Sequence, residues 1–171
     1  MAQKLIKYVS FDEFKKIVNA EEDKRFKLAY SLAFGSGLRL SEIVGYKNIK
    51  PLTKEQVDLE RHQIRIFGKG GKERITVTSP SLNKTNLELL PLNIPRRTLQ
   101  GRFTTLSKKV LGKKISFHTL RHGFANYMAN DKGVPLPMVQ LMLGHSRLDT
   151  TGIYTKANPT KTIEKAWESF Q

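Results

Sequence analysis

The feature that most restricts the fold of this chain is a glycine-rich turn between two segments that alternate polar and apolar residues. Residues 63–67 read Gln-Ile-Arg-Ile-Phe and residues 74–78 read Arg-Ile-Thr-Val-Thr, an alternation with the period of two that is typical of strands. Between them, Gly68-Lys69-Gly70-Gly71 supplies the glycines that a tight turn needs. We therefore predict an antiparallel hairpin, with a further strand at residues 57–60.

Helical patterns surround this hairpin on both sides. Ser10-Phe11-Asp12-Glu13 has the spacing of a capping box and predicts a first helix. A second helix is expected over residues 21–34, where Gly35-Ser36-Gly37 ends it, and a short third helix follows around residues 38–43. The chain is thus predicted to have an α+β fold, mainly helical, with one small antiparallel sheet that carries the Gly-rich hairpin. The later helices are predicted over residues 98–110, 119–130, 136–143, near 150–155 and over 160–171.

The charge balance restricts the class of partner. Lys and Arg number 30 against 15 Asp and Glu, which gives a formal net charge of +15. Such an excess points first to nucleic acid and second to an anionic membrane surface, with a merely basic surface as the plainer alternative. Because there are no cysteines, disulfides, thiolate zinc sites and a cysteine nucleophile are excluded. No apolar run approaches the ~20 residues of a membrane span and no signal peptide is recognisable, so we expect a cytoplasmic protein without a membrane partner.

Two segments place cationic side chains where they could hold a phosphate. His118 and Arg121 are three residues apart and would share a helix face, where an imidazole and a guanidinium can bind a phosphate and move a proton. Arg39 follows the Gly-Ser-Gly break and precedes Glu42 by three residues, so that the carboxylate could hold the guanidinium. Taken alone, the His118–Arg121 spacing usually indicates an ordinary surface pair, and Arg39 and Glu42 are also compatible with an ordinary surface salt bridge.

Three further residues are candidates for the same chemistry. Lys69 lies in the hairpin turn, where it either reaches into a DNA minor groove or to a reacting phosphate, or is a solvated lysine, and Lys72 offers the same group nearby. His145 follows Gly144, which is expected to end a helix in the left-handed conformation, and a histidine at such a turn is often structural. Tyr154 is either a core residue or a nucleophile, and as a nucleophile it needs cationic neighbours that stabilise its phenolate.

In their order along the chain, these residues resemble the signature of the tyrosine recombinases. Residues 37–42 (Gly-Leu-Arg-Leu-Ser-Glu) are similar to the first arginine box of the family, and residues 117–122 (Phe-His-Thr-Leu-Arg-His) to its second. Residues 143–146 (Leu-Gly-His-Ser) and 150–155 (Thr-Thr-Gly-Ile-Tyr-Thr) are similar to its tyrosine box. The resemblance to the catalytic domains of Xer-type recombinases and of phage or archaeal integrases covers about residues 10–160.

The resemblance implies an enzyme that cuts and rejoins double-stranded DNA through a 3′-phosphotyrosyl intermediate, a site-specific recombinase that needs no metal or other cofactor. Tyr154 would be the nucleophile, and His118 would accept its proton or support the transition state. Lys69, or Lys72 in its place, would protonate the leaving 5′-oxygen. The residues that would hold the non-bridging oxygens of the phosphate are Arg39, Arg121 and His145.

The resemblance also implies how the protein is organised. Residues 1–171 would form one catalytic domain, without the helical core-binding domain that usually precedes it in the family. In residues 160–171 an apolar stripe either packs on its own domain or is donated to a neighbouring subunit, as happens often in this family, within a homotetramer on DNA. The chain alone is expected to be a monomer. The stripe consists of Ile163, Ala166, Trp167 and Phe170.

Two other functions stay open from the sequence. A type IB topoisomerase uses the same chemistry but rejoins the same strand after the DNA has swivelled. A non-catalytic basic DNA-binding module would explain the charge, although it leaves the ordered Arg-Lys-His-Arg-His-Tyr set without a role. A covalent protein–DNA complex separates the module from both enzymes.

Overall fold

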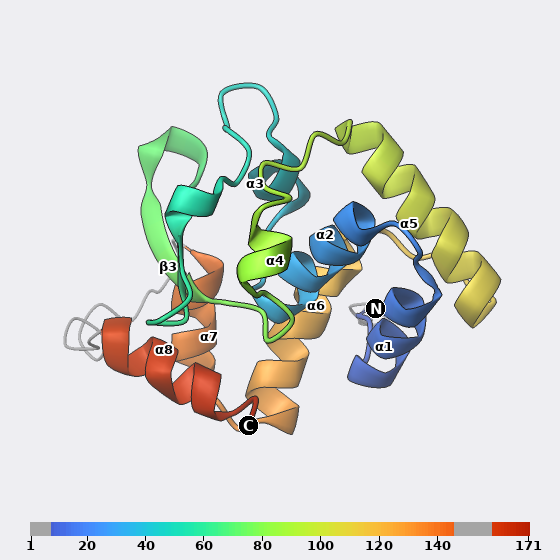
Figure 1. The fold of residues 1–171 in the computed structure, drawn as a ribbon. Coiled ribbons are helices and arrows are strands. Elements are labelled where there is room, and N and C mark those ends of the chain that lie inside the picture. The colour runs from blue at the N-terminus through green and yellow to red at the C-terminus, as the bar shows by residue number, and fades with distance from the viewer. Residues whose placement is uncertain (1–7, 146–158) are drawn as a thin grey trace, which may run out of the picture.

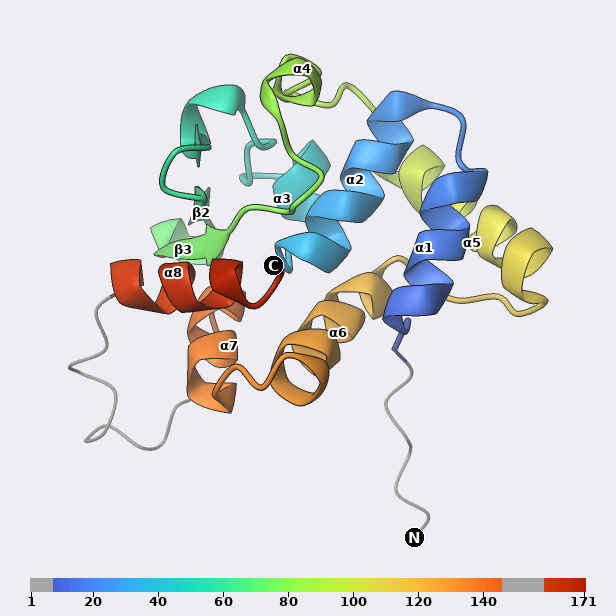
Figure 2. The ribbon, with the colours of Figure 1, turned by 60° about the horizontal axis from the view of Figure 1, so that its bottom comes forward.

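The computed structural model describes residues 8–145 and 159–171, and its chain forms a helical domain with one small sheet (Figures 1 and 2). No helix within these ranges is both long and apolar enough to cross a membrane. The α-helices are α1 (Phe11–Ala20), α2 (Lys24–Gly35), α3 (Leu40–Val44), α4 (Lys84–Leu87), α5 (Arg96–Leu111), α6 (His118–Asn126), α7 (Leu136–Leu143) and α8 (Pro159–Glu168). The remaining elements are the strands β1 (Val57–Asp58), β2 (Gln63–Phe67) and β3 (Glu73–Val77), the 3-10 turns η1 (Lys54–Gln56) and η2 (Lys69–Gly71), and the π-helical turn η3 (Tyr127–Asp131).

The predicted hairpin is present and forms two of the three strands of the sheet. The strand order is β1-β2-β3, and both pairings are antiparallel. Ile66 pairs with Arg74 across the hairpin, so these two side chains lie on the same face of the sheet. β1 ends two residues earlier than predicted, because the chain turns back before β2 through His62, whose φ is +54°.

The first helix begins as the sequence predicts, whereas the second begins three residues later. The capping box at Ser10 and Glu13 is formed in both directions. α2 starts at Lys24 with Asp23 as its N-cap, because the buried carboxylate of Glu21 accepts the backbone N–H groups of residues 22 and 23. The hydroxyl of Tyr30 also donates to Glu21, so this carboxylate holds the turn between the two helices.

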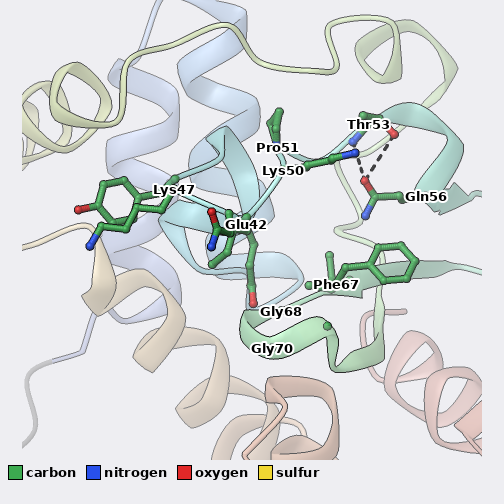
Figure 3. Close-up of a pocket in the computed structure, with 14 residues that line it drawn as sticks. Glu42, Lys47, Lys50, Pro51, Thr53, Gln56, Phe67, Gly68 and Gly70 are labelled. Atoms are coloured by element: carbon green, nitrogen blue, oxygen red, sulfur yellow. Dashed lines mark hydrogen bonds between the residues drawn. The ribbon is translucent and has the colours of Figure 1, made fainter.

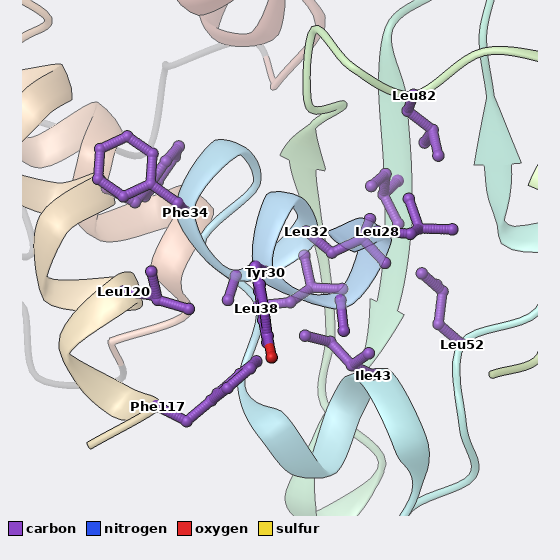
Figure 4. Packing of buried hydrophobic residues seen from close by; sticks show 14 of the residues in the cluster. Leu28, Tyr30, Leu32, Phe34, Leu38, Ile43, Leu52, Leu82, Phe117 and Leu120 are labelled. Carbon is purple, nitrogen blue, oxygen red and sulfur yellow. The ribbon is translucent and has the colours of Figure 1, made fainter. Parts of the chain in front are cut away.

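α2 lies at the centre of the core, where it packs against α6, α3 and α1 (Figures 1 and 4). Every residue of α2 from Leu28 to Gly35 is buried, which is the pattern of a helix surrounded by protein, whereas its first turn carries the charged Lys24, Arg25 and Lys27. α7 and α8 both pack against β3 (Figures 1 and 2). The sheet is therefore joined to the two helices that come last in the chain. Figure 4 shows part of the buried hydrophobic core around α2, which includes Leu28, Tyr30, Leu32, Phe34, Leu38, Ile43, Leu52, Leu82, Phe117 and Leu120.

In this chain the apolar stripe of α8 packs on its own domain. Ile163 and Ala166 are fully buried, and the Trp167 ring stacks on His62 with 3.7 Å between ring centroids and an interplanar angle of 6°. The Phe170 ring lies 6.4 Å from that of Tyr127, which is itself buried as core. Donation of this helix to a second copy stays a prediction.

We predict that Gly123→Ala destabilises the fold. A Cβ atom at Gly123 would clash with the Val9 carbonyl oxygen and would lie 2.7 Å from the Phe34 ring, so α6 would have to move away from α2. Overpacking of this kind costs about 1–3 kcal/mol, which lowers the melting temperature by several degrees. The matched control is Gly101→Ala in α5, where nothing lies within 4 Å of the new atom and where better helix propensity adds up to ~1 kcal/mol. Equal melting temperatures for the two variants would contradict this account of the packing.

Candidate active site

The site is organised around the buried guanidinium of Arg121, on the second turn of α6. The residue is 4% exposed, its Nη1 donates to the Gly37 carbonyl at 2.5 Å, and its Nη2 donates to the Leu143 carbonyl at 2.6 Å. Gly37 has a φ of +68°, and a Cβ there would lie 2.7 Å from the ring of Phe124. Only glycine fits this turn, and it brings the end of α2 and the end of α7 to the same side chain.

Arg39 lies just beyond this turn and is held by Glu42, as the sequence predicts. Its Nη1 lies 3.1 Å from Glu42 Oε1, and its backbone N–H donates to Oε2 at 2.7 Å. The helix α3 therefore begins after Arg39, and Glu42 caps it. The Arg39 side chain is 41% exposed, whereas that of Glu42 is 2% exposed, so the carboxylate is buried beneath a guanidinium that faces solvent.

Glu42 also binds a second arginine. Arg74 of β3 donates Nη1 to Oε1 at 2.6 Å and Nη2 to Oε2 at 2.8 Å, and its Nε donates to the Met142 carbonyl at 2.8 Å. Burial alone would raise the pKa of the Glu42 carboxyl, but the hydrogen bonds and charge of Arg74, followed by those of Arg39, lower it. Glu42 is therefore ionised at neutral pH.

Both predicted histidines are exposed beside these arginines. His118 is the first residue of α6, and His145 follows Gly144, which ends α7 in the left-handed conformation as predicted. Desolvation lowers the pKa of His118, and the charges of His122, Arg121 and Arg39 lower it further. Desolvation likewise lowers the pKa of His145, followed by the charges of Arg121, Arg39 and Arg74. Both imidazoles are neutral at pH 7.

The described part of the site thus carries more positive than negative charge. Burial lowers the pKa of Arg121 to about 9, and the charges of Arg39 and Arg74 add to this effect, so the guanidinium remains protonated at neutral pH. In the described residues, no carboxylate forms an ion pair with Arg121, and Glu42 already serves two other arginines. Such an arrangement is suited to an anion with several oxygens. In residues 8–145 and 159–171, no cluster of His, Asp or Glu is arranged to hold a metal ion.

The hairpin borders the site on one side. A cavity of about 1080 Å³ lies between its turn and the chain after α3, and Glu42, Phe67, Gly68 and Gly70 are among the residues on its walls (Figure 3). The backbone of Lys69 is in η2, and Gly70 and Gly71 both have positive φ, as a tight turn requires. Lys72 is exposed at the end of the same turn. The choice between the two lysines stays a prediction.

The structure brings together four of the six predicted site residues: Arg39, His118, Arg121 and His145. Tyr154 lies outside the described residues. Sequence reasoning assigned no role to two residues that the structure adds: Arg74, and His122, whose ring lies 4.5 Å from that of His118. The strand alternation could have found Arg74, because it pairs with Ile66, whose side chain is buried. A charged residue on that inward face needs a partner.

Comparisons with known proteins show which sequences and folds the chain is similar to. Residues 89–161 match the phage integrase family. The chain is 36% identical to tyrosine recombinase XerA of Pyrococcus horikoshii, covering 96% of this chain and 61% of the relative. It superposes on a crystal structure of XerA recombinase with a TM-score of 0.67 at 25% identity, covering 99% of this chain and 66% of that one. It also superposes on XerH recombinase bound to difH substrate, with a TM-score of 0.61 at 23% identity over 98% of this chain and 56% of that one.

The electrostatics of the site predict how its histidines titrate. In the free protein, we expect His118 and His145 to titrate below the usual value of about 6.5, because burial and nearby cations disfavour their charged forms. Inorganic phosphate should raise both pKa values, since a bound anion offsets those cations. NMR titration of the imidazole C–H resonances, with and without phosphate, measures both effects. Midpoints above 6.5 in the free protein, or no response to phosphate, would argue against an anion site here.

Proposed function

We propose that this chain, a tyrosine recombinase catalytic domain by its sequence and fold, cuts and rejoins DNA strands in site-specific recombination. It spans about 61% of the length of the XerA relative that it matches, so the reaction is proposed for this domain within its whole protein. DNA is the proposed substrate because the formal net charge is +15 and because the XerH structure of the same fold is bound to its difH substrate. A cytoplasmic location is part of the same proposal.

The observation that carries the proposal is the buried guanidinium of Arg121, which forms no ion pair with a carboxylate within residues 8–145 and 159–171. A buried cation is costly unless it is paired, so the position suits a side chain whose partner arrives with the substrate. Arg39, His118 and His145 lie around it with exposed or half-exposed donors. A phosphodiester offers one negative charge spread over two non-bridging oxygens, which matches this set of donors.

The chemistry assigns one role to each group. Arg39, Arg121 and His145 hold the non-bridging oxygens and stabilise the charge that grows on them. The Tyr154 hydroxyl oxygen attacks phosphorus, and His118, neutral at pH 7, accepts its proton. The bond between phosphorus and the 5′-oxygen breaks, and Lys69 donates the proton that makes this oxygen a hydroxyl. A 5′-hydroxyl of another strand then attacks the phosphotyrosine and restores the phosphodiester and Tyr154.

We also propose that four copies act together on DNA and that α8 links them. The apolar stripe that packs in cis here would bind the same surface of a neighbouring copy, as in other exchanges of an identical element. Trp167 and Phe170 remain partly exposed in cis, which leaves area for further burial in an assembly. The free chain is proposed to be a monomer.

The first test of the function concerns the nucleophile. We expect Tyr154→Phe to abolish covalent attachment to nicked DNA, because the substitution removes the hydroxyl oxygen that attacks phosphorus. DNA affinity should stay within a few fold of wild type, because every cationic side chain is kept. Denaturing gels detect the covalent complex, and sequencing of the trapped DNA identifies the site. Tyr127→Phe is the matched control, because Tyr127 is a buried core residue. If Tyr154→Phe attaches to DNA as wild type does, the assignment is wrong.

The same assay separates the alternatives. A non-catalytic binding module gives no covalent band with wild-type protein. A type IB topoisomerase gives the band and also relaxes supercoiled plasmid without a specific site. The proposed recombinase gives the band at a defined sequence and joins strands from two different duplexes.

The test of assembly uses the absence of cysteines from the chain. His62→Cys and Trp167→Cys place one thiol on each side of the α8 contact, whose rings lie 3.7 Å apart. In the double variant, a short bis-maleimide should cross-link the free protein within one chain. In an equimolar mixture of the two single variants, we expect cross-linked dimers only when DNA is present. If the mixture of single variants gives no dimers on DNA, and the double variant still cross-links only within one chain, exchange of the helix is refuted.

A further inference from the structure

We propose that Arg74 is a positioning residue, which fixes the Arg39 guanidinium and the turn that carries His145 relative to each other so that both meet the same phosphate. The inference rests on the proposed function of the site. Arg74 lies on β3, and its side chain is only 9% exposed. Within the described residues, its hydrogen bonds run into the protein, to α3 and to the end of α7. It therefore acts through other residues and is not itself placed in contact with substrate.

The first connection runs through Glu42 to Arg39. Both oxygens of Glu42 are shared, because Oε1 accepts from Arg74 and Arg39 side chains at 2.6 and 3.1 Å, and Oε2 accepts from Arg74 at 2.8 Å and from the Arg39 backbone at 2.7 Å. The carboxylate is almost fully buried, so its direction is set by these two arginines. Without Arg74, the carboxylate of Glu42 would bind only Arg39, whose side chain is partly exposed to solvent. The direction of the Glu42 carboxylate, and with it that of the Arg39 guanidinium, would then be less fixed.

The second connection runs to the turn that carries His145. The last carbonyl groups of a helix have no partner within it. In α7, Arg74 Nε binds the Met142 carbonyl and Arg121 Nη2 binds that of Leu143. A Cβ atom at Gly144 would lie 2.6 Å from Arg74 Cδ, so the backbone of the turn rests directly on the arginine stem. The position of His145, the next residue, follows from that contact.

The geometry requires an arginine and not only a positive charge. Three N–H groups of Arg74 bind three oxygens in different directions, which its planar fork supplies in one rigid unit. The ammonium group of a lysine is a single point at the end of a flexible stem. Arg74→Lys therefore keeps the charge near the site and removes the link between Glu42 and α7, which separates positioning from electrostatics.

The experiment compares Arg74→Lys with Arg65→Lys, an arginine on β2 that forms an exposed ion pair with Glu73. Phosphate affinity is measured from the His145 resonances, and the single-turnover rate of covalent attachment is measured on the DNA trapped by wild type. We expect Arg74→Lys to weaken phosphate binding about tenfold and to slow attachment ~10–100-fold, less than the ~10²–10³ of losing a direct donor. DNA affinity should change by less than threefold, and Arg65→Lys should stay within twofold in every assay.

A substrate with a sulfur atom as the 5′-bridging atom identifies which step is affected. Its leaving group needs no proton, so it rescues a defect in the lysine of the hairpin. The Arg74→Lys defect should persist with this substrate, because the fault lies in holding the non-bridging oxygens. Rescue by sulfur, or phosphate binding and attachment within twofold of wild type, would overturn the proposal.

Two controls keep these outcomes decisive. All assays are run at a temperature where circular dichroism shows the variants folded, and Glu42→Gln, which breaks the same link from the other side, replaces Arg74→Lys if that variant does not fold. Should wild type form no covalent complex with DNA, the proposed function fails. The phosphate titration then still decides the role of Arg74, because it needs no cleavage.

Discussion

The hydrogen bonds of Arg121 to two backbone carbonyls are the interaction on which the rest of the site depends. They join the glycine turn after α2 to the last turn of α7, and they do so with a side chain that is almost fully buried. Carbonyl oxygens stabilise the guanidinium only in part, because they carry no full negative charge. The fold thus accepts a costly buried cation, and its position fixes the distance between Arg39 on one side and His145 on the other.

Glu42 performs the complementary task from the opposite side. One carboxylate is shared by Arg39 and Arg74, so the cations are held apart in fixed directions without being neutralised one by one. Donors that are fixed before a substrate arrives need no reorganisation when charge develops, which is the main way in which proteins stabilise anionic transition states. The side chains and carbonyl groups that form this network come from β3, α3, α6 and α7. Movement of any one of these elements would leave the site incomplete.

Much of this arrangement was predictable from the sequence because local rules govern it. The alternating strands around Gly70, the capping box at Ser10 and the glycine after α7 depend on neighbours a few residues away, and all were found. The late start of α2 was missed, because the Glu21 carboxylate binds backbone N–H groups and Tyr30 in a way that helical periodicity does not reveal. Arg74 was missed for a similar reason, since its role comes from partners 32 and 68 residues away. The role of Tyr154 rests on the family resemblance alone.

The partners of Arg121 lie 84 residues before it and 22 residues after it in the chain. Contacts of such separation close long loops, and the entropy lost in closing them makes such contacts slow to form. A chain in which α7 has not yet docked therefore has neither the Leu143 carbonyl nor the following imidazole beside its arginines. The chemistry proposed for this domain breaks a DNA strand, and a copy in which α7 has not docked lacks the imidazole of His145 that is proposed to hold the phosphate. The proposed DNA cleavage therefore depends on a completed tertiary structure.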